Sequence, residues 1–459
     1  MPVGDIEIPA IGKDVVIPML VVPHVLIAAF IIGMFLIASV SEYAGLLTKQ
    51  PKYDRFAKNA ATTVILVFAV GSTIPIIFIL ALITLYPVFW SYAQNIMFWV
   101  LFAEAFMFVG EIILIYAWYA SWDKLAYRKK LHVVIGFMAA MLVIAQFTFI
   151  NVVGSYLLTP PEASATNVAA TYINATFLPL NMHRFVGNIS FAGFLVAGWG
   201  ALRYLRSTNE ANREYYDWMG HWGLMWGFGF LLLQPFIGYG YMKSIREHNS
   251  AAFDYIMTGD KSWLFNLLVT ELAIMAVASV AYCLHKLKFA EKPMPTLRNM
   301  TLGSLAFMSL FALLNMIPSD MNLVPQIGWV FFNGKDTTIP LGSMYPWKYI
   351  GLIGMMLVGI FVVGMYLKAT ASGFRWGRAS RWSQYALIAT AVTVVFTMLT
   401  MGYTRETARR GGDPPDGSDG FLINGCITLD QNVTAENCRV TPDKTRTLEK
   451  GNPSERGSA

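Results

Sequence analysis

The chain has 459 residues and a formal net charge of +6, and 56% of its residues are hydrophobic while only 14% are charged. A typical soluble chain carries about 25% charged residues, so this composition excludes an ordinary soluble enzyme and a disordered protein. The basic residues form no patch beside a polar domain, which excludes a nucleic-acid-binding protein. With a mean hydropathy of +0.50, the sequence predicts an all-α polytopic membrane protein.

Apolar stretches recur along the chain, each long enough as a helix to cross about 30 Å of hydrocarbon. They are not short segments of period two, which excludes a transmembrane β-barrel. The first stretch lacks a basic leader and is too long for a signal-peptide core, so we expect it to remain as a mature helix. Ten spans are predicted, at residues 17–43, 60–87, 95–120, 132–158, 178–202, 217–242, 263–285, 299–318, 346–367 and 382–403.

The number of lysine and arginine residues alternates between high and low in successive loops. The loops after the odd-numbered spans hold 19 basic residues, whereas the opposite loops hold only Lys243, Arg246, Lys261 and Lys335. Because basic loops remain on the cytoplasmic side, both termini are predicted to be extracytoplasmic. The chain then divides into an extracytoplasmic N-terminal segment (1–16), a transmembrane helical bundle (17–403) and a small extracytoplasmic tail (404–459).

Two of the three cysteines, Cys426 and Cys438, lie in the tail with eleven residues between them. In an oxidising compartment a disulfide is the expected state of such a pair, and two free thiols are the alternative. Cys283 falls in span seven, where we expect an inert small apolar residue. The chain contains no CxxCH motif, so we expect no covalently attached c-type haem.

Ionisable groups inside a membrane are costly and usually functional. Most of those in this chain fall in the half of the bilayer away from the basic loops. Glu104 and Glu111, seven residues apart, share one helical face, and Glu111 lies deepest, about 22–24 Å below the outer end of its helix. The candidates in or at the ends of spans are His24, Glu104, Glu111, His183, Arg184, Glu271, Lys348, Glu406 and Arg409.

Histidines on separate helices with cations nearby suit buried haems, since imidazole ligates iron and cations pair with propionates. No HExxH or cysteine-rich motif occurs, so zinc is a poor fit. A core histidine with an ordinary partner is the alternative for His24 and His183. Glu271 has three open roles: proton relay, salt-bridge partner or contact to another subunit. Interfacial anchoring is expected for the remaining histidines, His132, His221, His248 and His285.

These residues resemble subunit I of the cytochrome bd-type quinol oxidases. His24 lies in PHVLIAAFIIGMFLIASVSEYAGLL, which is similar to the first helix of that family, and the two glutamates lie in FAEAFMFVGEIILIYAWYASWDKL. Span four ends in NVVGSYLLTPPE, and His183 lies in NMHRFVGNISFAGF. MGYTRETARRGG resembles the Gly-Trp-xxx-Glu-x-Gly-Arg box of the family, with Glu406 and Arg409 at its spacing. The resemblance covers residues 17 to about 242 well and 346–412 more weakly.

The resemblance implies a role for each site residue. His24 and Glu406 would be axial ligands of two high-spin haems, and His183 would ligate a low-spin haem. Glu104 would stand beside the oxygen-reducing site, while Glu111 would deliver protons from the cytoplasm. Propionates would be neutralised by Arg184, Lys348 and Arg409.

The resemblance also implies cofactors, partners and location. We expect two or three haems, of type b and with haem d as an option, and quinone as a further ligand. The expected partners are a second hydrophobic oxidase subunit, the lipid membrane, and quinol or a periplasmic cytochrome c as donor. No nucleic acid is expected. The location implied is a bacterial plasma (inner) membrane.

Four features depart from the family pattern. Ile350 stands where the family has the methionine that completes the low-spin haem. Three alternatives follow: that iron is five-coordinate, Met344, Met355 or Met356 supplies the ligand, or the haem has been lost. The long quinol-binding loop after span six is missing, because the segment 243–262 is short and two extra spans follow. Gly402, Ala408 and Arg410-Gly411-Gly412 replace tryptophan and the usual end of the box. The cysteine-bearing tail replaces the final helix.

Three functions remain open on this basis. The first is a haem-binding subunit of a bd-like terminal oxidase that passes electrons from quinol or a periplasmic donor to dioxygen. The second is a membrane electron-transfer subunit that works between quinone and a periplasmic multihaem cytochrome and does not reduce oxygen. The third is a haem-free transporter or scaffold, against which the lack of an inverted repeat counts.

Overall fold

The computed structural model describes residues 13–159, 172–257, 261–317, 346–410, 422–423 and 426–427. Within these ranges the chain is almost entirely helical, which confirms the predicted all-α class. A two-stranded antiparallel sheet, β1 (Leu422–Ile423) and β2 (Cys426–Ile427), is the exception. The helices are α1 (Lys13–Thr48), α2 (Pro51–Gly71), α3 (Thr73–Leu85), α4 (Pro87–Ala120), α5 (Lys129–Leu158), α7 (Phe177–Arg206), α8 (Glu210–Leu231), α9 (Gln234–His248), α10 (Ser250–Met257), α11 (Ser262–Lys286), α12 (Pro295–Met316), α14 (Pro346–Ala371) and α15 (Arg381–Arg410), with short 3-10 turns η1 (Ala126–Arg128) and η2 (Leu287–Phe289).

Nine helical segments of the described chain are long and apolar enough to cross a membrane. They correspond to predicted spans one to five and seven to ten. The sixth predicted span, 217–242, is not a single helix, because it is divided between α8 and α9 at Leu232 and Leu233. Pro235 lies in the first turn of α9, where a missing N–H breaks no helical hydrogen bond. The last helix continues to Arg410, seven residues beyond the end expected from hydropathy.

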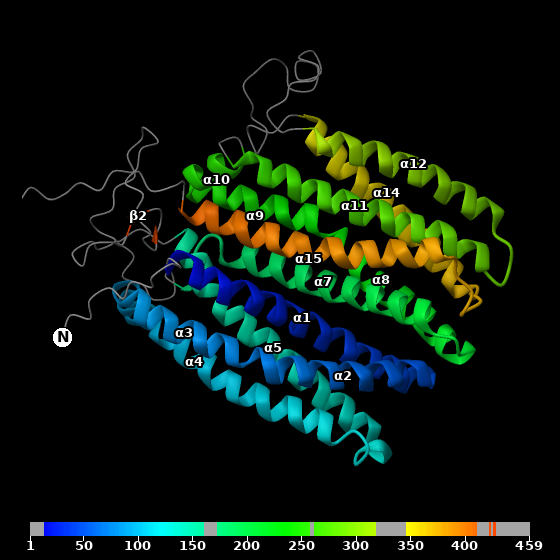
Figure 1. Ribbon diagram of the computed structural model, residues 1–459, viewed down its shortest axis with the longest axis horizontal. Coiled ribbons are helices and arrows are strands. Elements are labelled where there is room, and N and C mark those ends of the chain that lie inside the picture. Colours follow the sequence, from blue (N-terminus) through cyan, green and yellow to red (C-terminus); the bar gives the residue numbers. More distant parts are fainter. Residues whose placement is uncertain are drawn as a thin grey trace, which may run out of the picture.

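The long helices lie along one common axis, with the chain passing back and forth between the two ends of the bundle. The five basic loops gather at one end, on the right of Figure 1. This end, called the basic end below, holds the connections α1–α2, α4–α5, α7–α8, α11–α12 and α14–α15. The alternation of charge in the sequence therefore separates the two ends of the folded bundle. Which end faces the cytoplasm remains a prediction from the positive-inside rule.

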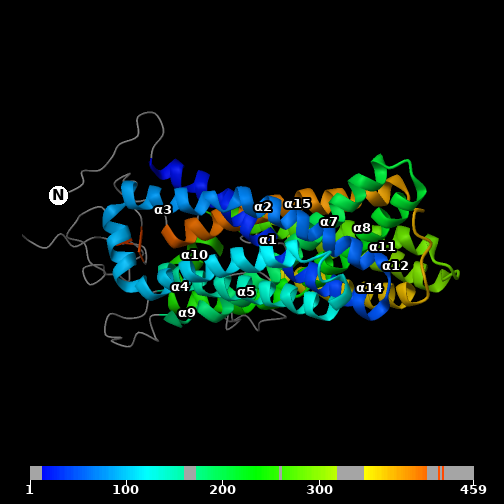
Figure 2. The ribbon, with the colours of Figure 1, turned by 90° about the horizontal axis from the view of Figure 1, so that it is seen from below.

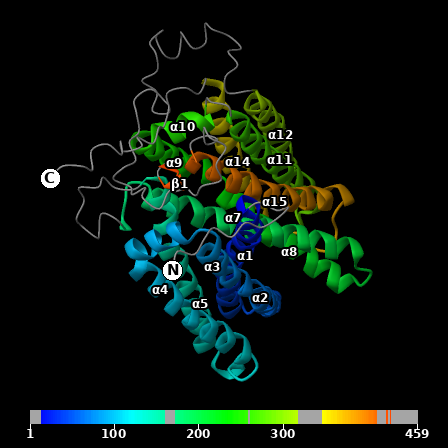
Figure 3. The same cartoon turned by 60° about the vertical axis from the view of Figure 1, so that its left-hand side comes forward.

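The helices form three groups, which the views of Figures 1 and 3 separate clearly. Helices α1 to α5 form one side, α11, α12 and α14 form the other, and α7, α8, α9 and α15 lie between them. Figure 2 shows the bundle from below, with α2 and α3 following one another as a bent rod. Helix α7 contacts α1, α8 and α15, so it is the central element.

Small residues bring α7 and α8 into close contact. A Cβ added at Gly193 of α7 would lie 2.3 Å from the backbone nitrogen of Gly227, and one added at Gly223 of α8 would lie 2.4 Å from the nitrogen of Ala197. Such distances leave no room for a side chain. Close approach through small residues is the usual way in which membrane helices pack, and it fixes α7, which carries His183 and Arg184.

Candidate haem and proton-transfer site

His183 lies on α7 at the end of the bundle opposite the basic end, against α9. Its ring stacks on the ring of Tyr241, with centroids 5.7 Å apart and planes inclined by 27°. Gln234 of α9 donates to the His183 carbonyl at 3.0 Å. Gly238 of α9 lies beside the imidazole, since a Cβ added there would be 3.5 Å from His183 Cε1, an ordinary van der Waals distance. The buried Nδ1 has no partner among the described residues.

Two half-buried arginines flank this histidine. Arg184, the next residue on α7, donates to Asn151 of α5, and its guanidinium carbon lies 5.5 Å from the ring centre of Phe147. Arg405 of α15 donates to the Gly154 carbonyl at 2.8 Å and interacts with Tyr241. Among the described side chains, neither arginine forms a salt bridge with a carboxylate. Two cations held in this way suit an anionic group that enters from outside the chain.

Arg405 was not among the residues predicted from the sequence. It directly precedes Glu406 in MGYTRETARR, and the resemblance drew attention to Glu406 and Arg409 instead. The usable signal was its position near the end of an apolar span, where an arginine is costly unless it has a function. Glu406 and Arg409 belong to α15, but their side chains lie outside the described part of the structure.

His24 lies on α1, half-buried, and interacts electrostatically with Arg184 of α7. Since α1 packs directly against α7, the structure brings His24 and the His183 region to the same end of the bundle. The sequence predicted this shared depth. The roles of both histidines as ligands remain proposals.

Glu104 and Glu111 lie on α4, as predicted. Gln146 of α5 donates to Glu104 Oε1 at 3.1 Å, and the buried Oε2 has no partner among the described residues. Glu111 is 6% exposed and interacts electrostatically with Glu104. One helical heptad further along the same face is Trp118, whose Nε1 donates to Glu42 Oε2 at 3.0 Å.

A buried charged cluster terminates this line at the basic end. His132 Nδ1 lies 2.5 Å from Glu42 Oε1, and His132 Nε2 lies 2.9 Å from the Trp118 carbonyl. Lys129 contacts both Glu42 and Asp54 at 3.0 Å. The cluster joins α1, α2, α4 and α5, and the sequence analysis did not find it, because its partners come from different helices.

Two histidines expected to anchor the protein at the interface are instead buried. His132 is 1% exposed and His221 is 4% exposed. His221 lies among aromatic rings, 5.2 Å from Trp376 and 5.4 Å from Tyr366 between ring centres. The interfacial assignment was wrong for these two, because helix-end position says nothing of what a neighbouring helix supplies. His285 is half-buried, and His248 is exposed at the end of α9.

Lys348 is fully buried, and its described hydrogen bonds go to α11 and α12. It donates to Asn266 Oδ1 of α11 at 2.7 Å and to the Asn315 carbonyl of α12. Ile350, at the position of the family methionine, is 40% exposed on α14. Met355 and Met356 line a small cavity beside the break between α8 and α9, together with Leu231, Leu232, Pro235, Leu272, Ala276 and Leu352. Met344 lies outside the described residues.

The remaining predicted positions are partly described. Glu271 of α11 is 7% exposed and accepts a hydrogen bond from Thr400 of α15 at 2.8 Å. Cys283 is a buried free thiol. Cys426 is placed as part of β2, but its side chain and the whole of Cys438 lie outside the described residues, so the disulfide is untested.

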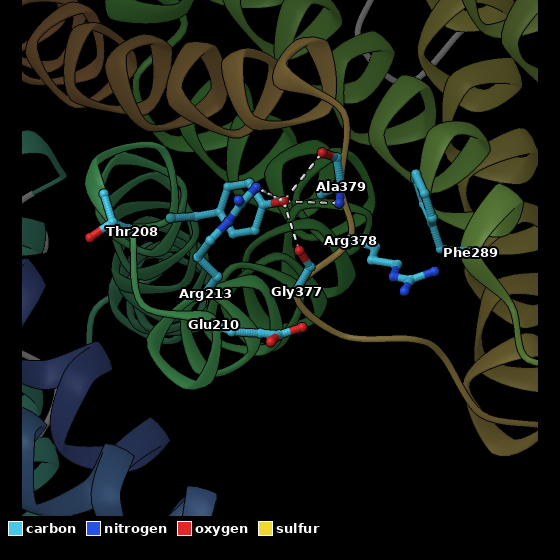
Figure 4. A pocket seen from close by; sticks show the side chains of 8 residues that line it. Thr208, Glu210, Arg213, Phe289, Gly377, Arg378 and Ala379 are labelled. Atoms are coloured by element: carbon cyan, nitrogen blue, oxygen red, sulfur yellow. Dashed lines mark hydrogen bonds between the residues drawn. The ribbon is translucent and has the colours of Figure 1, made fainter.

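A cavity of about 410 Å³ lies at the basic end. Figure 4 shows its lining, with Tyr204 hydrogen-bonded to the backbone of Gly377 and Ala379 and to the guanidinium of Arg213. It is lined by the C-terminal end of α7, the start of α8, η2 and the loop between α14 and α15. This cavity is therefore at the opposite end of the bundle from His183 and is separate from that site.

The His183 region fits a haem on its own chemistry. It offers an imidazole nitrogen with no described partner, two arginines for carboxylates, and apolar helices around them. Glutamates on α4 add groups that can carry protons toward the same half of the bundle. Together, these features define a haem-binding membrane bundle of the redox class.

Comparisons with known proteins agree with this class. Residues 16–410 match the family described as cytochrome bd terminal oxidase subunit I. The structure of bd oxidase from Geobacillus thermodenitrificans is similar with a TM-score of 0.50 and 14% sequence identity, over 87% of this chain and 97% of that one. No curated protein sequence matches the chain significantly.

The chain belongs to the cytochrome bd terminal oxidase subunit I family. It is accordingly a multi-pass, haem-carrying membrane subunit of respiratory electron transport. The fold likeness agrees with this assignment.

Proposed function

We propose that the chain is the haem-bearing catalytic subunit of a bd-like terminal oxidase in a bacterial plasma membrane. It would accept electrons from quinol or a periplasmic cytochrome c at the outer side and take protons from the cytoplasm. The observation that carries the proposal is the pairing of an available imidazole, His183, with two arginines that have no described carboxylate partner. Reduction of one dioxygen to two waters consumes four electrons and four protons, so the site needs both a cofactor region and a proton supply.

The bound haems supply the electron transfer and oxygen chemistry. In the proposal His183 ligates a low-spin haem, and His24 and Glu406 ligate two high-spin haems. Arg184 and Arg405 hold propionates, with Arg409 as a further candidate. Lys348 is proposed for the same role by resemblance only, since its described hydrogen bonds go to Asn266 and Asn315. We propose two or three haems of type b, with haem d as an option.

The chain itself supplies the protons in this proposal. Glu111 receives a proton from the basic end, where Glu42, His132 and Lys129 form the buried cluster, and passes it to Glu104. Glu104 then has one carboxylate oxygen held by Gln146 and one free of described partners to hold the proton. A fixed donor for one oxygen leaves the other available, which is what a proton-transfer carboxyl requires.

The proposed partners follow from the membrane setting. A second hydrophobic subunit would cover part of the bundle, and the tail at 404–459, with a disulfide between Cys426 and Cys438, would lie on the outer side. The N-terminal segment 1–16 would lie on that side as well.

An electron-transfer subunit that does not reduce oxygen is the second candidate. One observation favours it: Ile350, at the position of the family methionine, is exposed on α14, so that position offers no ligand. Such a subunit would work between quinone and a periplasmic multihaem cytochrome.

One set of measurements on the purified complex separates the candidates. A pyridine haemochrome assay counts and types the haems, and carbon monoxide difference spectra detect a high-spin haem. The oxidase proposal expects a carbon monoxide-reactive haem and oxygen consumption with quinol or reduced cytochrome c. Haems that bind no carbon monoxide, with no oxygen consumption from any donor, would establish the electron-transfer subunit instead.

A further inference from the structure

Buried polar side chains line the contact between α11 and α15. Glu271, Ser279 and Tyr282 of α11 share one face and are at most 7% exposed. Ser383, Thr390, Thr397 and Thr404 of α15 recur at intervals of seven residues, with Thr400 beside them. Intervals of seven keep side chains on one face of a helix, so both helices present a polar stripe.

The two stripes meet at Glu271. Thr400 donates to its Oε1 at 2.8 Å, and the Thr397 hydroxyl, which donates to the Thr393 carbonyl at 2.9 Å, lies close to the same carboxyl group. The helices run antiparallel, so from this contact Ser279 on α11 and Thr390 on α15 lie at the same level, about 10–12 Å nearer the basic end at 1.5 Å per residue. The stripes therefore face each other over several turns.

One unsatisfied polar atom lies at this contact. Glu271 Oε2 is buried with no partner among the described residues. Buried polar groups are almost always hydrogen-bonded, and those without a protein partner bind internal water. Such a carboxylate oxygen between two polar stripes is the setting for a hydrogen-bonded water chain.

The row connects two regions already described. At the basic end, Tyr282 interacts electrostatically with Asp217, which forms a buried ion pair with Lys286. At the other end, Thr404 donates to the Thr400 carbonyl at 2.7 Å, and the next residue is Arg405 of the His183 region. Ser279, Thr390 and Thr397 donate to carbonyls of their own helices. Their hydroxyl oxygens can still accept hydrogen bonds from water, so the row can position waters that pass a proton.

We propose that Glu271 is a proton-transfer residue on a second path, which runs between α11 and α15 from the basic end to the His183 region. This path lies across α7 from the Glu104–Glu111 line on α4, as Figure 3 shows for the helices. In each cycle the Glu271 carboxyl group gives one proton toward Thr404 and regains one from the Thr390 side. No electron moves in this step, and the carboxyl group returns to its starting state.

The inference rests on the proposed function only for the fate of the proton, so the test includes a measurement without oxygen. The haem-loaded complex is reduced anaerobically with hexaammineruthenium(II), a one-electron reductant that releases no proton, in a stopped-flow instrument, and proton uptake is followed with a pH-indicator dye. Glu271→Gln keeps the shape and can still accept from threonine, yet it should slow the phase that depends on Glu271 by roughly 10²-fold, as expected for loss of a positioned acid–base group. Thr400→Val should slow it less, and Glu271→Asp should restore part of the rate.

Thr301→Val is the matched control, because Thr301 is 1% exposed and has the same kind of hydrogen bond, to Leu297 of its own helix, but lies on α12, outside the contact between α11 and α15. It should leave proton uptake unchanged. In a Glu111→Gln background, adding Glu271→Gln should slow the uptake that remains, which is the result for two separate paths.

Wild-type proton uptake in Glu271→Gln would overturn the proposal and leave Glu271 with a structural role. A double variant no slower than Glu111→Gln alone would overturn the separate path. If Glu271→Gln fails to retain haem, unchanged uptake in both Glu271→Asp and Thr400→Val would overturn it. A wild type that takes up protons through Glu271 but consumes no oxygen would refute the oxidase function and keep the path.

Discussion

The imidazole of His183 stacks on the phenol ring of Tyr241 at 5.7 Å between ring centres, so α7 and α9 meet at the residue proposed to hold the low-spin haem. Tyr241 is 8% exposed and interacts with both Arg184 and Arg405. One tyrosine thus contacts the proposed iron ligand and both proposed propionate partners. The break between α8 and α9 is what places α9 here.

Replacement of His183 by alanine should remove the low-spin haem and leave the others. Imidazole is the iron ligand, and no other described side chain of α7 offers one at this depth. The pyridine haemochrome assay of the purified complex should show the loss of one haem per chain. His248→Ala is the control, since that histidine is exposed on α9. Full haem content in His183→Ala would refute the assignment.

Neutralising Arg405 should lower the midpoint potential of the haem at His183. A positive charge beside a propionate favours the reduced state, so Arg405→Gln should shift the potential downward by on the order of 50 mV, since a tenfold change in a one-electron equilibrium is about 59 mV. Arg405→Lys keeps the charge and should shift it less. Spectroelectrochemical titration gives the values, and an unchanged potential in Arg405→Gln would place the propionates elsewhere.

The sequence predicted the helical bundle because long apolar stretches are an unambiguous signal. It did not predict the break inside the sixth span, which falls at Leu232 and Leu233, just before Pro235. Both ends of α8 and α9 depend on contacts with other helices, which hydropathy does not report.

The candidate site was predictable where a single residue is unusual by itself. His24, His183 and the two glutamates stand out as polar groups in apolar helices. Glu42 and His132 did not stand out, because each lies near a helix end, where a charged residue is common. Their pairing, with His132 Nδ1 2.5 Å from Glu42 Oε1, joins residues that are 90 positions apart in the sequence. Arg405 was missed for a related reason, since its partners Gly154 and Tyr241 lie on α5 and α9.

Replacing Glu111 by glutamine should slow oxygen reduction while the haems remain. The amide keeps the shape but cannot release a proton, so turnover should fall by on the order of 10²-fold, the usual contribution of a positioned acid–base group. Oxygen consumption and haem spectra are measured on the same sample. The control is Ser190→Ala, because Ser190 lies on α7 and its hydroxyl donates to the Gly227 carbonyl. Gln234→Glu would not serve as a control, since Gln234 donates to the His183 carbonyl. Wild-type turnover in Glu111→Gln would remove Glu111 from the proton path.

Removing Lys286 should destabilise the basic end strongly. Its Nζ lies 2.5 Å from Asp217 Oδ2, and the two side chains are 1% and 0% exposed, so Lys286→Met leaves a buried carboxylate without its cation. Breaking such a pair costs about 3–5 kcal/mol, whereas replacing both partners by apolar residues is often neutral. The double variant Asp217→Leu, Lys286→Met should therefore recover most of the thermal stability of the detergent-solubilised complex.

Lys243→Met is the comparison, since the Lys243–Glu247 pair is half-exposed, with 3.7 Å between Nζ and Oε1, and is worth about 0–1 kcal/mol. If Lys286→Met melts with the wild type, Asp217 satisfies its charge without the lysine, through Gly377, which donates to the same oxygen at 3.0 Å.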